Sequence, residues 1–91
     1  MFHVLKSTYL KAPEIVDETR PSHLAWLEEE VTAGRLVLAG RQDDGSGGVL
    51  ITADMEVNAV DDLLKTDPYV KAGVASYERT SFNAAARAPG L

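Results

Sequence analysis

The chain has 91 residues, 45% hydrophobic and 25% charged, a composition typical of one globular domain spanning residues 1–91. A net charge of -5 opposes binding to phosphate backbones and anionic lipids, so we expect no nucleic-acid or membrane partner. The sequence contains no cysteine, which excludes disulfides and thiolate chemistry and favours a cytoplasmic location.

The first segments predict a strand and a loop. Residues alternate between the two sides of an extended chain from Phe2 to Leu10, which indicates a first strand. The stretch from Lys11 to Glu18 contains Pro13 and three acidic residues without an apolar period, so it predicts a connecting loop.

A helix is predicted from Pro21 to the residues before Gly34. Pro21 suits a first helical turn, and Leu24, Leu27 and Val31 recur at spacings of three and four, which predicts one buried stripe. Gly34 suits the left-handed turn that ends a helix.

A hairpin is predicted next. The apolar run from Arg35 to Gly40 indicates a strand that is buried on both faces or pairs centrally. Turn-forming residues fill positions 41–48, and Val49 to Ala53 returns as the second strand. The Asp-Gly-Ser segment lacks the ligand spacing of a calcium loop and the Lys-Ser/Thr of a nucleotide-binding loop, so a turn explains it better.

The last part of the chain predicts a helix, a strand and a tail. Asp54 can cap a helix that ends before Asp67-Pro68, and its apolar face comprises Val57, Val60, Leu63 and Leu64. Val74 to Phe82 indicates a final strand. The Ala-rich tail 83–91 is expected to be loose or to reach another subunit.

This order of elements predicts an α+β fold of the ferredoxin-like βαββαβ kind, with both helices on one face of a four-stranded antiparallel sheet. The other face would then expose apolar side chains, for which the candidates are Phe2, Val4, Leu10, Val74 and Phe82. We therefore expect a homodimer packed sheet against sheet. Ser76, Glu78 and Thr80 would make its interior mixed in polarity.

Two residues are candidates for proton transfer. His23 is expected in the first turn of its helix, where the helix dipole favours the neutral imidazole that accepts a proton. Asp67 is expected at a helix C-terminus, where a carboxylate is electrostatically unfavourable and therefore invites a functional explanation. The structural alternatives are a hydrogen-bonded, partly buried histidine and an aspartate that starts a turn. His3 is expected to be structural.

Anion binding is the second candidate chemistry. Arg20 can hold a carboxylate or phenolate with its planar guanidinium, or can be solvated on the surface. We expect no metal site, because the two histidines lie far apart and no His-x-x-Glu pattern accompanies them.

Four short motifs occur in a fixed order along most of the chain. They are Arg20-Pro21-Ser22-His23-Leu24, Gly34-Arg35-Leu36, Ala39-Gly40 and Asp67-Pro68-Tyr69-Val70-Lys71-Ala72-Gly73-Val74. As a set they resemble the YCII-related (YciI-like) family, and the resemblance implies a dimeric α+β barrel.

The resemblance also implies site residues. His23 would be the general base or acid, Asp67 its orienting partner and Arg20 an anion-binding neighbour, while Gly40 and Tyr69 would shape the pocket. The sequence departs from the family at Arg41, where the family often has proline. This added charge would favour acidic ligands or would face solvent.

Two hypotheses on function follow. The first is a cofactor-independent isomerase or lyase that transfers protons on a small, oxygen-rich aromatic or lactone-like molecule. The second is a non-catalytic module that binds a metabolite in the same cleft. A haem or flavin oxygenase has only fold-level analogy in its favour.

Overall fold

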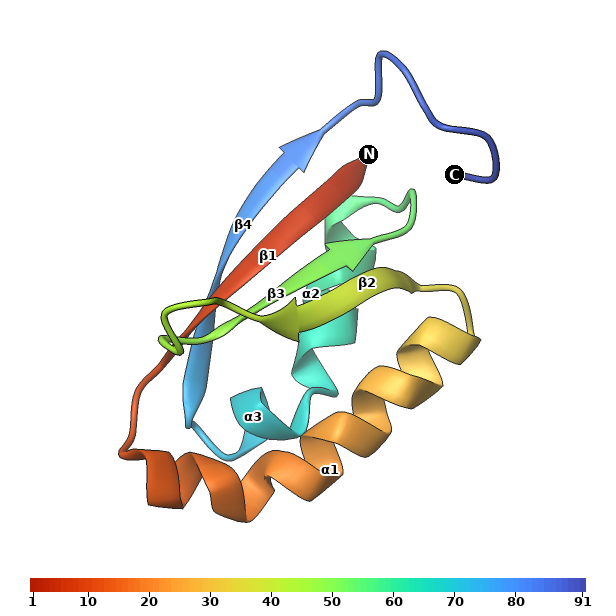
Figure 1. Ribbon diagram of the computed structural model, residues 1–91. Helices are drawn as coiled ribbons and strands as arrows, with labels where there is room; N and C mark the ends of the chain where they lie inside the picture. Colours follow the sequence, from red (N-terminus) through yellow and green to blue (C-terminus); the bar gives the residue numbers. More distant parts are fainter.

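A four-stranded antiparallel sheet in the order β2-β3-β1-β4 carries the helices on one of its faces (Figure 1). The computed structural model describes residues 1–91. Its elements are β1 (Phe2–Tyr9), α1 (Pro13–Thr32), β2 (Leu36–Arg41), β3 (Gly48–Thr52), α2 (Val57–Lys65), α3 (Pro68–Lys71) and β4 (Ala75–Phe82). The predicted ferredoxin-like βαββαβ fold is therefore confirmed. None of the helices is both long enough and apolar enough to cross a bilayer.

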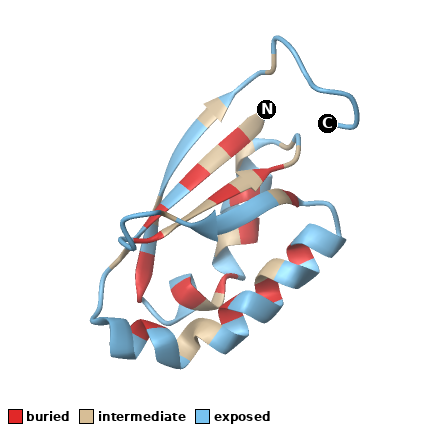
Figure 2. Ribbon diagram, viewed as in Figure 1, coloured by how far each residue is buried: buried red, intermediate tan, exposed pale blue.

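The two faces of the sheet differ in burial. Along β1, His3, Leu5 and Ser7 are buried beneath the helices, whereas their neighbours on the other face are only partly covered or exposed (Figure 2). Two apolar clusters fill the space between sheet and helices: Leu5, Trp26, Leu36, Leu50, Val60 and Leu63 in one, and Val16, Tyr69, Val74 and Ala75 in the other. Val74 is thus a core residue, and its predicted place on the open face is wrong.

Helix α1 starts much earlier than the sequence pattern predicted. Pro13 occupies the first turn, so the segment up to Glu18 is helical rather than a loop, and Pro21 lies inside the helix. Val16 explains the difference, because it is buried against the second cluster and provides the tertiary contact that a propensity argument omits. His23 is therefore in the middle of α1, and the expected influence of a helix N-terminus on it does not apply.

The buried stripe of α1 is also different from the predicted one. Leu24 and Val31 remain 47% and 44% exposed, while the buried positions are Val16, His23, Trp26 and Glu30. The apolar pattern missed this stripe because two of its members are polar. His23 is satisfied by Asp67, and Glu30 accepts the Nε–H of Arg35.

Further boundary predictions need correction. Strand β2 lies at an edge of the sheet rather than in its centre, and only Leu36 in it is buried. The Asp54 side chain does not cap α2, whose N-cap is Glu56; it accepts the amino group of Met1 instead. That the tail 83–91 is loose or reaches another subunit stays a prediction; within the chain, the Arg87 guanidinium lies 4.9 Å from the centre of the Phe2 ring and 3.6 Å from an Asp54 oxygen.

The turn between β2 and β3 is fastened to the end of β1. The Gln42 side chain donates to the Ser7 carbonyl oxygen over 2.8 Å, and the Gly48 N–H donates to Ser7 Oγ over 2.7 Å. Gly47 passes so close that a β-carbon there would lie 1.8 Å from the Ser7 carbonyl oxygen. This position requires glycine because of close approach, since its φ is not positive.

We expect Gly47→Ala to lower the free energy of unfolding by about 3 kcal/mol, because two backbone segments must separate to admit the methyl group. Gly45→Ala is the matched control. Its β-carbon would meet no atom within 4 Å, so its cost is confined to the positive φ of 74° and should be about 1 kcal/mol. Urea denaturation measures the free energy of unfolding of both variants. Equal losses of stability would show that the close approach of Gly47 to Ser7 does not determine the cost of the substitution.

Candidate functional site

The Asp67 carboxylate lies fully buried at the junction of α2 and α3. Its Oδ1 accepts the Tyr69 N–H over 2.9 Å and His23 Nδ1 over 2.8 Å, and its Oδ2 accepts the Tyr77 hydroxyl over 2.7 Å. Three hydrogen bonds from different elements compensate for the loss of hydration of this buried charge. The backbone contact also makes Asp67 the N-cap of α3, a helix that the sequence pattern did not predict.

This arrangement determines which nitrogen of His23 carries the proton. Both oxygens of Asp67 act as acceptors, so Nδ1 of His23 is the donor. In the neutral ring Nε2 then has a free lone pair, and it makes no hydrogen bond within the chain. His23 also lines the pocket described below. The geometry therefore presents a proton acceptor to any small molecule that enters.

Aromatic rings fix the plane of His23. Its imidazole stacks on the Tyr69 ring with 3.8 Å between centroids and 6° between planes. Trp26 lies on α1 beside it, at 5.8 Å between centroids, and donates its Nε1–H to Thr66 Oγ1. Stacking and the bond to Asp67 together leave the imidazole little freedom to rotate.

Tyr77 remains protonated in this environment. Burial raises the pKa of its phenol well above the ordinary value of 10.0, and the charge of Asp67 and the hydrogen bond to it raise the pKa further. Tyr77 therefore acts as a hydrogen-bond donor to Asp67 throughout the neutral range. No sequence motif had singled it out, although its place on the helix-facing side of β4, two residues after the buried Ala75, was readable from the alternation.

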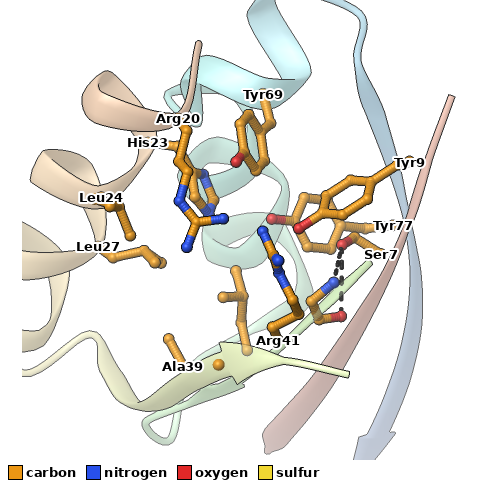
Figure 3. A pocket seen from close by; sticks show the side chains of 13 residues that line it. Ser7, Tyr9, Arg20, His23, Leu24, Leu27, Ala39, Arg41, Tyr69 and Tyr77 are labelled. Carbon is orange, nitrogen blue, oxygen red and sulfur yellow. Dashed lines mark hydrogen bonds between the residues drawn. The ribbon is translucent and has the colours of Figure 1, made fainter. Parts of the chain in front are cut away.

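A pocket of about 220 Å³ opens above His23 between α1, α3 and the sheet (Figure 3). Arg20 enters it from α1 and Arg41 from the end of β2, and the two guanidinium groups point toward each other (Figure 3). The backbone of Gly40 forms part of the wall. Further lining residues that the sequence did not indicate are Ser7, Tyr9, Leu24, Leu27, Ala39, Gly48, Leu50 and Tyr77.

The structure thus places five of the six sequence-predicted site residues around one pocket, with Asp67 hydrogen-bonded to His23 behind it. The five are Arg20, His23, Gly40, Arg41 and Tyr69. Burial raises the pKa of Tyr69 and the nearby Tyr9 adds to this rise, whereas Arg20 and Arg41 act in the opposite direction. No group of three or more His, Cys, Asp or Glu side chains converges as a set of metal ligands.

The chain belongs to the YCII-related family, because the family model of the YCII-related domain matches residues 1–83. No curated protein matches its sequence. Among solved structures, the fold is similar to that of 5-chloro-2-hydroxyhydroquinone dehydrochlorinase from Burkholderia phenoliruptrix AC1100 in complex with 2,5-dihydroxybenzoquinone. The TM-score is 0.73 at 19% identity, and the match covers 91% of this chain and 94% of that one.

We expect Tyr77→Phe to lower the free energy of unfolding at pH 7 by about 1–3 kcal/mol, because it removes a donor from a buried carboxylate. A phenol with a raised pKa in the folded state stabilises the protein below its unfolded pKa, and this contribution is lost as the pH rises above about 10. The difference between wild type and Tyr77→Phe should therefore shrink above pH 10 in urea denaturation.

Tyr9→Phe is the matched control, since the Tyr9 hydroxyl makes no hydrogen bond within the chain, and its stability at pH 7 should equal that of wild type. A Tyr77→Phe variant as stable as Tyr9→Phe would show that the bond to Asp67 contributes nothing.

Proposed function

We propose that the protein is a cofactor-independent enzyme that transfers protons on a small oxygen-rich molecule, aromatic or lactone-like, as an isomerase or lyase. The observation that carries this proposal is the orientation of His23 by the buried Asp67, with Nε2 left unbonded in a pocket lined by Arg20 and Arg41. A positioned base beside cations is the equipment needed to remove a proton and to stabilise the resulting anion.

Each site residue has a distinct proposed role. His23 Nε2 accepts a proton from a C–H or O–H group of the substrate, and the buried Asp67 stabilises the imidazolium that forms. Arg20 and Arg41 supply the positive charge that stabilises the electron pair as it spreads onto the substrate oxygens. In an isomerisation His23 returns the proton to another atom of the substrate. In an elimination the electron pair forms a new π bond, the leaving group departs with the electrons of its own bond, and His23 releases the proton to the leaving group or to water. Gly40 and Tyr69 shape the cavity wall.

The structural neighbour supports the proposed substrate class without defining the substrate. Its name describes a dehydrochlorinase that acts on a chlorinated hydroxyhydroquinone, and its ligand is a dihydroxybenzoquinone. A planar six-membered ring with several oxygens is also compatible with a cavity of about 220 Å³.

We expect the protein to catalyse the exchange of substrate C–H hydrogens for deuterium. The exchange is measured by proton NMR in D₂O with a panel of hydroxyquinones and butenolides. His23→Gln should lower the rate of exchange about 100-fold or more, because the base is lost. Asp67→Asn should lower kcat more than it raises KM, since it changes the tautomer of His23 rather than the cavity wall.

Folding of each variant is checked by circular dichroism, and ligand binding by calorimetry. Exchange that persists in folded His23→Gln would contradict the assigned base. Compounds that bind to wild type and to His23→Gln alike, with no exchange and no product, would instead establish a non-catalytic binding or accessory module.

We further propose that a second copy of the chain covers the open face of the sheet. Phe2 and Phe82 lie opposite each other there, 6.0 Å apart between ring centroids, and Phe82 is 45% exposed. Val4 lies opposite Ile51 on the neighbouring strand. This apolar end of the open face continues into a polar end, where Lys6 lies opposite Glu78. A copy of the same sheet offers the same mixture of apolar and polar groups.

Val4→Asp should convert the dimer to a monomer, because it would bury an unpaired carboxylate in the interface while leaving the isolated chain folded. Light scattering coupled to size-exclusion chromatography measures this. Ile15→Asp is the control: Ile15 is exposed on α1, on the helical side of the sheet, and its variant should stay dimeric. A wild type that is monomeric at every concentration, or a Val4→Asp variant as dimeric as wild type, would overturn the arrangement.

A further inference from the structure

The arginines of this chain differ in how their charge is compensated. Arg35 pairs with Glu30, Arg87 pairs with Asp54, and Arg79 donates to Ser81. The remaining two, Arg20 and Arg41, form neither an ion pair nor a side-chain hydrogen bond within the chain, although acidic residues outnumber basic ones by 14 to 9. Both unpaired guanidinium groups line the His23 pocket.

The two side chains reach the cavity from different elements. Arg20 is held by α1 and Arg41 by the edge strand β2, and their guanidinium groups face each other (Figure 3). Both act on Tyr69 electrostatically, which places that ring within the field of both cations. Two like charges facing one cavity repel each other unless a ligand of opposite charge lies between them.

We propose that the ligand of this pocket is a small planar dianion with acidic oxygens at opposite ends, one for Arg20 and one for Arg41, and that Arg41 selects it over the corresponding monoanion. This inference rests on the proposed function only for the identity of the site. In such a pose the ring spans the space over which His23 Nε2 opens, and each guanidinium donates to one end of the ligand.

Arg41 supplies the second positive charge on which this selection depends. With Arg20 alone, one acidic oxygen would be bound and the other would face an uncharged wall. With both arginines, the second negative charge gains a partner.

The test compares 2,5-dihydroxy-1,4-benzoquinone, which ionises at two opposite oxygens, with 2-hydroxy-5-methoxy-1,4-benzoquinone, which ionises at one. The two probes have nearly the same shape, and the chain has no cysteine for quinones to alkylate. Isothermal titration calorimetry at pH 8 should show the dianion binding to wild type roughly tenfold to a hundredfold more tightly than the monoanion. The preference should weaken at high salt.

Arg41→Gln should lower affinity for the dianion to the level of the monoanion while changing affinity for the monoanion less than about threefold. Arg87→Gln is the matched control, because it removes the same charge from the tail, outside the pocket, and should preserve the preference. Equal binding of the two probes to wild type, binding of neither, or a preference that survives Arg41→Gln overturns the proposal.

The outcome can be separated from that of the proton-transfer proposal. Selective binding of the dianion without deuterium exchange would support the proposed ligand class and contradict the proposed proton-transfer activity. Equal binding of the two probes, with exchange as fast on the monoanion as on the dianion, would support the proton-transfer activity and contradict the selectivity for the dianion.

Discussion

One buried carboxylate joins α1, α3 and β4. Asp67 has no exposed surface, and its two oxygens receive hydrogen bonds from α1, from the backbone of α3 and from β4. Loss of any one of these donors would leave part of the buried carboxylate without a hydrogen bond and would lower the stability of the fold. The carboxylate therefore couples the position of the long helix to the outer strand of the sheet.

The hydrogen bond to Asp67 makes the two nitrogens of His23 different, because Nδ1 is bonded and Nε2 is not. One edge of the His23 ring is committed to Asp67 and one face is stacked on Tyr69, so the opposite edge is the part of the ring left for a ligand. Because these contacts join separate elements, the orientation of the ring belongs to the tertiary structure rather than to α1 alone. Substitution of Tyr77, which itself lines the pocket, would also reach His23 through Asp67.

Parts of this structure were predictable because their signals are local. The alternation in β1, the turn residues at 41–48 and the apolar spacing of α2 each follow from neighbouring residues, and together they gave the topology. The start of α1 was not predictable in this way, since Pro13 and its acidic neighbours become helical through the burial of Val16. The inner face of α1 was missed for a related reason. His23 and Glu30 are polar and are buried because they pair with Asp67 and Arg35, and a search for apolar spacing does not detect such positions.

The candidate site shows the same division. His23, Asp67 and Arg20 were singled out by residue type and local position, and the motif resemblance then strengthened the prediction. The bond from Tyr77 to Asp67 and the close approach of Gly47 to Ser7 are tertiary contacts that spacing does not encode. One oxygen of Asp67 accepts the Tyr69 N–H at the start of a helix, as the turn-starting alternative predicted, and the same oxygen also accepts a hydrogen bond from His23. A structural role and a positioning role are thus compatible in a single carboxylate.

The two sides of the pocket are held in different ways, and this difference bears on specificity. His23 and its partners are held by a buried, fully hydrogen-bonded network, in which any change of side chain disturbs several elements at once. Arg41, by contrast, is exposed at the end of the edge strand β2 and has no partner whose loss would destabilise the fold. In the proposed enzyme the acid–base groups are therefore difficult to alter, while the charge facing the ligand is easy to alter. Selection among acidic ligands would accordingly depend on the rim of the pocket rather than on the base beneath it.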